Sequence, residues 1–177
     1  MSIIDRALAA VTPQPSDERR AEATEKARAA AEANDWLTLA LDQHDQIRRC
    51  FREGREATAP EARLAAMKAL ADVLNPHSAA EEVVLYPAMA QHGHKMQAGA
   101  AYGEQTTTKM QMSELENIDP AAKAWTDKWE HIEGAVLTHM FEEENGWFIH
   151  LKEHAPDQAR LTVRFAEEVS RCSGRSG

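Results

Sequence analysis

Cysteine is scarce in this chain, and its scarcity excludes one class of fold. Only two of the 177 residues are cysteine, Cys50 and Cys172, and no CxxC pair occurs. Disulfide-held secreted domains and thiolate zinc sites both need more cysteine than this. We therefore expect a cytoplasmic protein whose fold depends on a hydrophobic core.

Long apolar runs and an excess of basic residues are also missing. No stretch is long and apolar enough to span a bilayer, and residues 1–6 lack the basic and apolar regions of a signal peptide. The net charge is −9, whereas nucleic-acid-binding domains carry a basic patch. We expect neither a membrane nor a nucleic acid as a partner.

Turn residues are few, with eight Gly and seven Pro, and no strand pattern occurs. The chain is instead rich in Ala, Glu, Lys and Arg, which favour helix. Apolar periodicity predicts helices over residues 36–56, 60–90, 98–116 and 121–154. Four long helices with short connections predict an all-α, antiparallel four-helix bundle.

Segments at both ends are expected to lie outside this bundle. Residues 1–34 should form an N-terminal helical extension, with an apolar stripe over 2–11 and a polar helix from Ser16 to Asn34 that packs loosely. The metal-binding bundle is expected over residues 35–155. Residues 156–177 should form a short C-terminal helix and a polar tail.

Local residues predict where the bundle helices begin or break. Asp35 is expected to cap the helix that starts at Trp36, and Asp119 the one that follows Pro120. Pro76 lies inside an apolar stripe, where it should either kink the helix or split it, with Asn75 capping the second piece.

A repeated motif places imidazoles and carboxylates on two of these helices. His77 is followed at i+4 by Glu81 and then Glu82, and His139 is followed at i+4 by Glu143 and then Glu144. Residues four apart lie on one face of a helix, with Cβ atoms about 5–6 Å apart. Two such pairs offer nitrogen and oxygen donors that can close around a metal ion inside a bundle.

The positions of these residues put them at one level of the bundle. In an antiparallel hairpin, two residues are level when the turn lies midway between them. The midpoint of His44 and His77 falls at Pro60, that of His77 and Gln105 at Gln91, and that of Gln105 and His139 close to Pro120. Each of these midpoints coincides with a predicted break between helices.

Buried carboxylates at this level need a positive partner. An unpaired buried charge costs several kcal/mol, so Glu81 and Glu143 on apolar stripes predict a cation held by both. Histidines and carboxylates without thiolates suit iron or manganese, and zinc is an alternative.

Each residue also has an ordinary structural interpretation. A single core histidine such as His44 is more often hydrogen-bonded than a ligand, and a single HxxxE is usually a surface pair. Glu82, Glu142 and Glu144 are expected to be solvated. Tyr86 and Tyr102 are expected to pack in the core, and hydrogen bonding near the site is their alternative role. Three core histidines and two core carboxylates at one level favour the metal site over these interpretations.

At these residues the chain resembles the hemerythrin-like, HHE cation-binding family, over about Trp36 to Leu151. The matching segments are Leu-Asp-Gln-His44, His77 to Pro87, Glu104-Gln105, and His139 to Phe148. The resemblance implies a four-helix bundle around two iron ions bridged by carboxylates or an oxo group. It also implies binding or handling of O2, peroxide or nitric oxide, or iron buffering.

The ligands implied by the resemblance are His44, His77, Glu81, His139 and Glu143, completed by a residue of the third bundle helix. The family usually has Glu-His at that place, and this chain has Glu104-Gln105. The helix face points between the two, and we favour Glu104 because a carboxylate is the stronger donor for a hard cation. His131 lies about 80° around its helix from His139 and is the third candidate.

A carboxylate in place of the histidine argues against simple reversible O2 carriage. One alternative is therefore an oxidase- or peroxidase-type enzyme, although no histidine has Glu three residues before it, as ferritin-like sites do. Another is a signalling module with a structural metal and residues 1–34 as its output. If the protein binds or senses O2 or a related oxidant, or is an oxidase or peroxidase, deleting residues 1–34 should leave the metal content intact.

Overall fold

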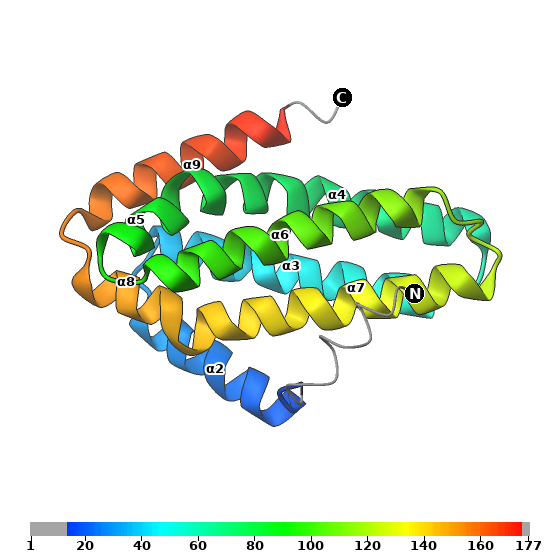
Figure 1. Ribbon diagram of the computed structural model, residues 1–177, viewed down its shortest axis with the longest axis horizontal. Coiled ribbons are helices and arrows are strands. Elements are labelled where there is room, and N and C mark those ends of the chain that lie inside the picture. The colour runs from blue at the N-terminus through cyan, green and yellow to red at the C-terminus, as the bar shows by residue number, and fades with distance from the viewer. Residues whose placement is uncertain (1–13, 175–177) are drawn as a thin grey trace.

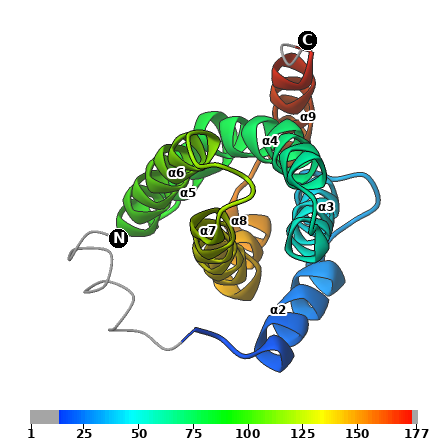
Figure 2. The same ribbon diagram turned by 90° about the vertical axis from the view of Figure 1, so that its right-hand side faces the viewer.

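The computed structural model describes residues 14–174, and all its regular elements are helices (Figure 1). The bundle helices are α3 (Trp36–Glu56), α4 (Pro60–Ala80), α6 (Lys95–Glu116) and α7 (Lys123–Glu142). The second of these continues through the π-helical segment η1 (Glu81–Leu85) into α5 (Tyr86–Gln91). The fourth continues through η2 (Glu143–Trp147) into α8 (Phe148–His154). The expected all-α four-helix bundle is confirmed, and the end-on view shows its four members around one core (Figure 2).

Local signals explain where α3 and α4 start, whereas α6 and α7 begin without a side-chain cap. The Asp35 carboxylate accepts a hydrogen bond from the Thr38 amide at 2.7 Å and caps α3, and Pro60 opens α4 as its first residue. The prediction that Asp119 caps the last bundle helix is wrong. Asp119 accepts instead from the Ala121 amide at 2.9 Å in a turn, and the helix begins only at Lys123.

Of the two alternatives expected at Pro76, a kink or a split, the structure rules out the split. Helix α4 runs through Pro76 without interruption, and Asn75 is an interior residue, not a cap. The backbone changes only at Glu81, where η1 begins, and the same change occurs at Glu143 in η2. Both irregular segments therefore begin at the carboxylates of the repeated motif.

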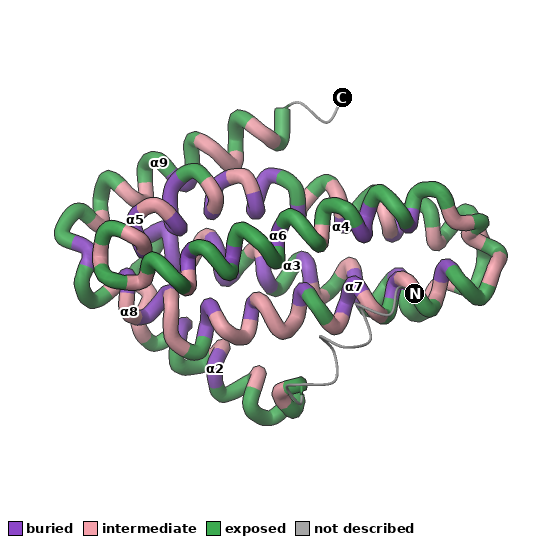
Figure 3. Tube along the Cα trace, viewed as in Figure 1, coloured by how far each residue is buried: buried purple, intermediate pink, exposed green. Residues whose placement is uncertain are grey.

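The core consists of two apolar clusters with a polar layer between them. Along α3, Leu41 belongs to one cluster and Ile47 to the other, and His44 lies between them. His77 lies in the same way between Leu74 and Ala80 on α4. Buried residues line the inner faces of the helices along the whole bundle (Figure 3).

Helix α2 (Asp17–Ala30) packs more closely than its polar sequence suggests. Ala23 and Ala27 are buried, and these small side chains let the helix approach α3 and η2 (Figure 2). Arg28 pairs with Asp42 and Asp45 of α3 at 2.7 and 2.8 Å. The predicted polar helix is thus present as α2, mostly exposed, with specific contacts to α3 and η2. The apolar stripe expected over residues 2–11 lies outside the described residues.

Helix α9 (Gln158–Ser173) covers the bundle at the end that carries η1 and the start of α3. Phe165 is its buried anchor, and the Trp36 indole donates to the Gln158 side-chain oxygen at 2.7 Å. Among the helices described for residues 14–174, none combines the length and the apolar character that crossing a bilayer requires.

Candidate metal centre

Four side chains from four separate elements meet in the polar layer. They are His44 of α3, His77 of α4, Glu81 of η1 and Glu143 of η2. Each offers one ligand atom, these atoms all lie within 4.8 Å of one another, and all four residues are buried. This is the packing that the common level of the sequence positions predicted.

Both carboxylates of this layer face two sides. On one side, Glu81 Oε1 lies 3.0 Å from His77 Nε2, and Glu143 Oε2 lies 3.4 Å from His44 Nε2. On the other side, Glu143 Oε1 lies 3.2 Å from His139 Nε2, and Glu81 Oε2 lies 3.1 Å from the Tyr86 hydroxyl. Each carboxylate thus presents one oxygen to the His44–His77 side and one to the His139 side.

The inward atoms on the His44–His77 side are not satisfied within the protein. His44 Nε2, Glu81 Oε1 and Glu143 Oε2 are buried and have no hydrogen-bond partner among the described residues. The imidazole–carboxylate contacts at this point are short, but they lack hydrogen-bond geometry. Buried polar atoms are normally paired, and a cation at this point would satisfy all three.

The outward ring nitrogens are held in place by oxygen acceptors. Each Nδ1 contacts one: His44 with Glu144 at 2.6 Å, His77 with Gln43 at 3.0 Å, and His139 with Glu104 at 2.7 Å. A histidine whose Nδ1–H is bound in this way presents the Nε2 lone pair inward. Metal-binding histidines are held by the same arrangement.

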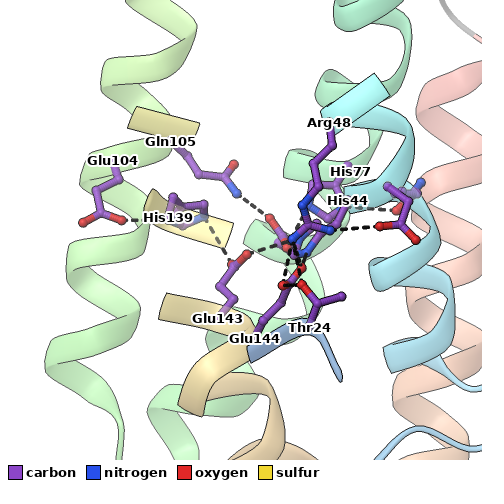
Figure 4. A network of polar contacts seen from close by, with 12 residues as sticks. Thr24, His44, Arg48, His77, Glu104, Gln105, His139, Glu143 and Glu144 are labelled. Atoms are coloured by element: carbon purple, nitrogen blue, oxygen red, sulfur yellow. Dashed lines mark hydrogen bonds and ion pairs between the residues drawn. The ribbon is translucent and has the colours of Figure 1, made fainter. Parts of the chain in front are cut away.

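Gln105, and not Glu104, is the residue of α6 that points into the layer. Gln105 is 5% exposed, and its amide nitrogen lies 2.5 Å from Glu81 Oε2. The Glu104 side chain is 45% exposed and contacts the outward nitrogen of His139, on the side away from His44 and His77 (Figure 4). His131 contacts Gln111 at 3.0 Å and lies outside the cluster of four.

Glu144 was expected to be solvated, and this expectation is wrong. It is fully buried, and it accepts hydrogen bonds from both Arg48 of α3 and Thr24 of α2, the latter at 2.5 Å (Figure 4). Sequence analysis missed this role because Glu144 looks the same as Glu82 in its own helix. Only the packing of α2 distinguishes the two.

Both roles expected for Tyr86 occur together. Its ring is buried in the core, and its hydroxyl lies within hydrogen-bond distance of the polar layer, an arrangement that the π-helical segment explains. The Tyr86 amide donates to the Glu81 carbonyl, five residues back, so the wider turn brings both side chains onto one face. In a regular α-helix, residues five apart would point about 140° apart.

Charge accounts for the protonation of the layer when no cation is present. Burial alone lowers the pKa of His44, but Glu143 and Glu144 outweigh burial and raise it from 6.5 to about 9. Burial likewise opposes protonation of His139, yet Glu143 and Glu104 hold its pKa well above the ordinary value. Without a metal ion, protons on these imidazoles balance the buried carboxylates, and a bound cation would take their place.

A small cavity of about 20 Å³ adjoins the layer. Its polar lining includes His77, Glu81, Gln105 and His139, and its apolar lining includes Ile47, Leu74, Val136 and Met140. This space holds about one molecule of the size of water. The space beside the layer therefore suits a small molecule.

Comparison with known proteins agrees with this geometry. The family model of the hemerythrin HHE cation-binding domain matches residues 37–151, which contain every residue of the cluster. Searches of curated proteins and of solved structures give no significant match. The match covers well over half of the chain, and the chain therefore belongs to the hemerythrin HHE cation-binding domain family.

Proposed function

We propose that the polar layer holds two iron ions bridged by Glu81 and Glu143. The observation that carries this proposal is the two-sided placement of both carboxylates, since each has one oxygen toward His44 and His77 and one toward His139. His44 and His77 would bind one ion, and His139 the other. The cluster of His44, His77, Glu81 and Glu143 by itself accounts for only one ion.

This proposal places a different residue of α6 beside the metal from the one that the sequence favoured. Glu104 was favoured as the stronger donor, but its position behind His139 suits orientation of that imidazole better than contact with a metal. Gln105 faces the layer directly. We therefore assign Glu104 the role of holding His139, and we place Gln105 next to the metal ion on the His139 side.

The donor set supports iron, with manganese or zinc as the alternatives. It combines imidazole nitrogens and carboxylate oxygens without thiolate, and the free thiol of Cys50 lies outside the cluster. The bound ions would supply the redox chemistry. The chain's own contribution is to orient the imidazoles, bridge the ions and limit access.

The function that this centre supports best is to bind, sense or react with O2, peroxide or nitric oxide. The small, partly apolar cavity beside His77 and His139 supports it, because a space of about 20 Å³ suits a molecule of a few atoms. An oxidase- or peroxidase-type enzyme and an iron buffer would use the same ligands, and turnover separates them from a sensor. We keep the cytoplasm as the proposed compartment.

A signalling function is the second candidate, and one contact favours it. Thr24 of α2 bonds to Glu144, which in turn holds His44, so α2 and the metal site are directly connected. This contact also changes the expectation for deleting residues 1–34, because the deletion would disturb His44 even if the segment had no signalling role. The division into residues 1–34, 35–155 and 156–177 is proposed on sequence grounds.

Metal analysis and absorption spectra of the iron-loaded protein, with and without O2 or peroxide, test the proposal. We expect about two irons per chain in the wild type and loss of iron in His77→Ala, whereas His131→Ala should keep both. Reversible spectral change with O2 would indicate binding or sensing, and peroxide consumption an enzyme. No bound metal, or unchanged binding in His77→Ala, would overturn the proposal.

A further inference from the structure

The Tyr86 hydroxyl is surrounded by polar atoms on the His139 side of the layer. Four groups lie within hydrogen-bond distance of its oxygen: Gln105 Nε2 at 2.6 Å, His139 Nε2 at 2.9 Å, Glu143 Oε1 at 3.0 Å and Glu81 Oε2 at 3.1 Å. Tyr86 itself is fully buried. A packing role for the ring does not require any of these four contacts.

Two carboxylate oxygens compete for the proton of this hydroxyl. A phenol has a single proton to donate, and Glu81 Oε2 and Glu143 Oε1 both lie within hydrogen-bond distance of it. The hydroxyl can therefore donate fully to only one of the two carboxylates, and a cation among these atoms would interact with all three oxygens.

The two sides of the layer also differ in their number of strong donors. The first side has two imidazoles, His44 and His77, besides the two carboxylates. The second has only His139, because α6 offers the neutral amide of Gln105 at this place. An oxygen donor from Tyr86 would make the two sides equal in number.

On the basis of the proposed two-iron centre, we propose that the Tyr86 oxygen is a ligand of the metal ion on the His139 side. When ferric iron binds, the O–H bond breaks, an oxygen–metal bond forms and the proton leaves to solvent, with no change in oxidation state. Gln105 Nε2 then donates to the bound phenolate oxygen at the distance it already has. This explains why an amide, which is a donor, stands beside the Tyr86 hydroxyl.

The chain offers a well-matched control for this proposal. It contains only two tyrosines, and the second, Tyr102, lies 5.2 Å from Tyr86 between ring centroids. The Tyr102 hydroxyl donates to the Glu82 backbone carbonyl and is far less buried. Any phenolate signal from iron must therefore come from one of two neighbouring rings with different surroundings.

The test is visible absorption and resonance Raman spectroscopy of the iron-loaded, ferric protein, with iron content measured in parallel. We expect a phenolate-to-iron charge-transfer band with enhanced phenolate ring vibrations in the wild type. Tyr86→Phe should lose both signals, and Tyr102→Phe should keep them. The wild-type and Tyr102→Phe spectra decide the matter even if Tyr86→Phe fails to fold.

The outcomes separate this inference from the proposed function. Two irons per chain without phenolate vibrations would overturn the role of Tyr86 and leave the two-iron centre standing. Signals that persist in Tyr86→Phe, or disappear in Tyr102→Phe, would also overturn it. A chain that binds no iron would overturn both proposals.

Discussion

The two copies of the HxxxEE motif differ most at their last residue. Glu82, after His77 and Glu81, lies at the surface with a side chain 23% exposed and pairs with Lys109. Glu144, after His139 and Glu143, is fully buried and contacts His44, Arg48 and Thr24. The same local sequence thus gives a solvated charge in one helix and a support for a candidate ligand in the other.

The difference comes from what covers each helix. The Glu144 face of η2 is covered by α2, whose Thr24 reaches it, and by α3, which supplies Arg48 and His44. The face that carries Glu82 stays partly open, and the Glu82 carboxylate meets the long side chain of Lys109 from α6 at its edge. A local repeat therefore fixes which residues share a helix face but not which face becomes buried.

Removing Glu144 should have the largest effect on this comparison. Glu144→Ala leaves the His44 imidazole and the Arg48 guanidinium without their shared carboxylate, and breaking a buried ion pair costs about 3–5 kcal/mol. Urea unfolding of the metal-free protein would measure this loss. Glu82→Ala is the matched control and should cost less than about 1 kcal/mol. Equal losses in the two variants would contradict the difference between the motifs.

The pH dependence of the metal-free protein should show the same asymmetry. The pKa of His44 is raised from 6.5 to about 9, so its stabilising contribution is complete below pH 6.5 and is lost as pH rises through 9. The total loss of unfolding free energy from this group is about 3 kcal/mol, at 1.36 kcal/mol per pKa unit. Unfolding free energies between pH 6 and pH 10 would measure it.

Variants of the two second glutamates make this pH prediction specific. Glu144→Gln removes one of the two carboxylates that raise the His44 pKa, so the decline with pH should become smaller. Glu82→Gln should leave the decline unchanged. Bound metal should abolish it, because coordination takes the place of the Nε2 proton of His44. A decline of equal size in all of these samples would argue against His44 as its source.

The contact from α2 should have a smaller effect. Thr24→Val keeps the shape of the side chain but deletes the hydrogen bond to Glu144, and bonds to charged groups contribute about 1.5–3 kcal/mol. We expect a loss of about that size in unfolding free energy, together with weaker iron binding in a competition titration. The matched control is Thr106→Val, whose hydroxyl bonds only to the exposed Tyr102 carbonyl. Unchanged iron affinity in Thr24→Val would show that α2 is not coupled to the site.

The smallest effect is expected at the partner of Glu82. Lys109→Met removes an exposed ion pair, which contributes about 0.2–1 kcal/mol and is screened by salt. Unfolding at low and high ionic strength would measure it, and the iron content should remain that of the wild type. A loss of iron in this variant would mean that the Glu82 side supports the metal after all.

Much of the arrangement follows from periodicity. Helix boundaries near Trp36 and Pro60 were predicted from caps and proline, and the level shared by His44, His77 and Glu143 was predicted from turn positions. These predictions succeed because hydrogen bonding within a helix is local, and a stripe of period 3.6 shows which residues face inward.

The π-helical segments explain what periodicity missed. An α-helical count from Glu81 turns Tyr86 away from the layer, whereas the wider turn of η1 brings it in. A count along α6 also left Glu104 and Gln105 undecided, since the helix face points between them. In the structure Gln105 is buried against Glu81 and Tyr86, whereas Glu104 lies beside His139 with an exposed side chain.

The sequence by itself determined an all-α bundle and the inward positions of three histidines and two glutamates, because each depends on residues within a few turns. Tertiary structure decided that Gln105 faces the layer, that the Tyr86 hydroxyl joins it and that Glu144 is buried while Glu82 is not. The buried Glu144 carboxylate accepts a hydrogen bond from Thr24, which is 120 residues away along the chain. Contacts over such distances arise from the packing of whole helices, and no local pattern encodes them.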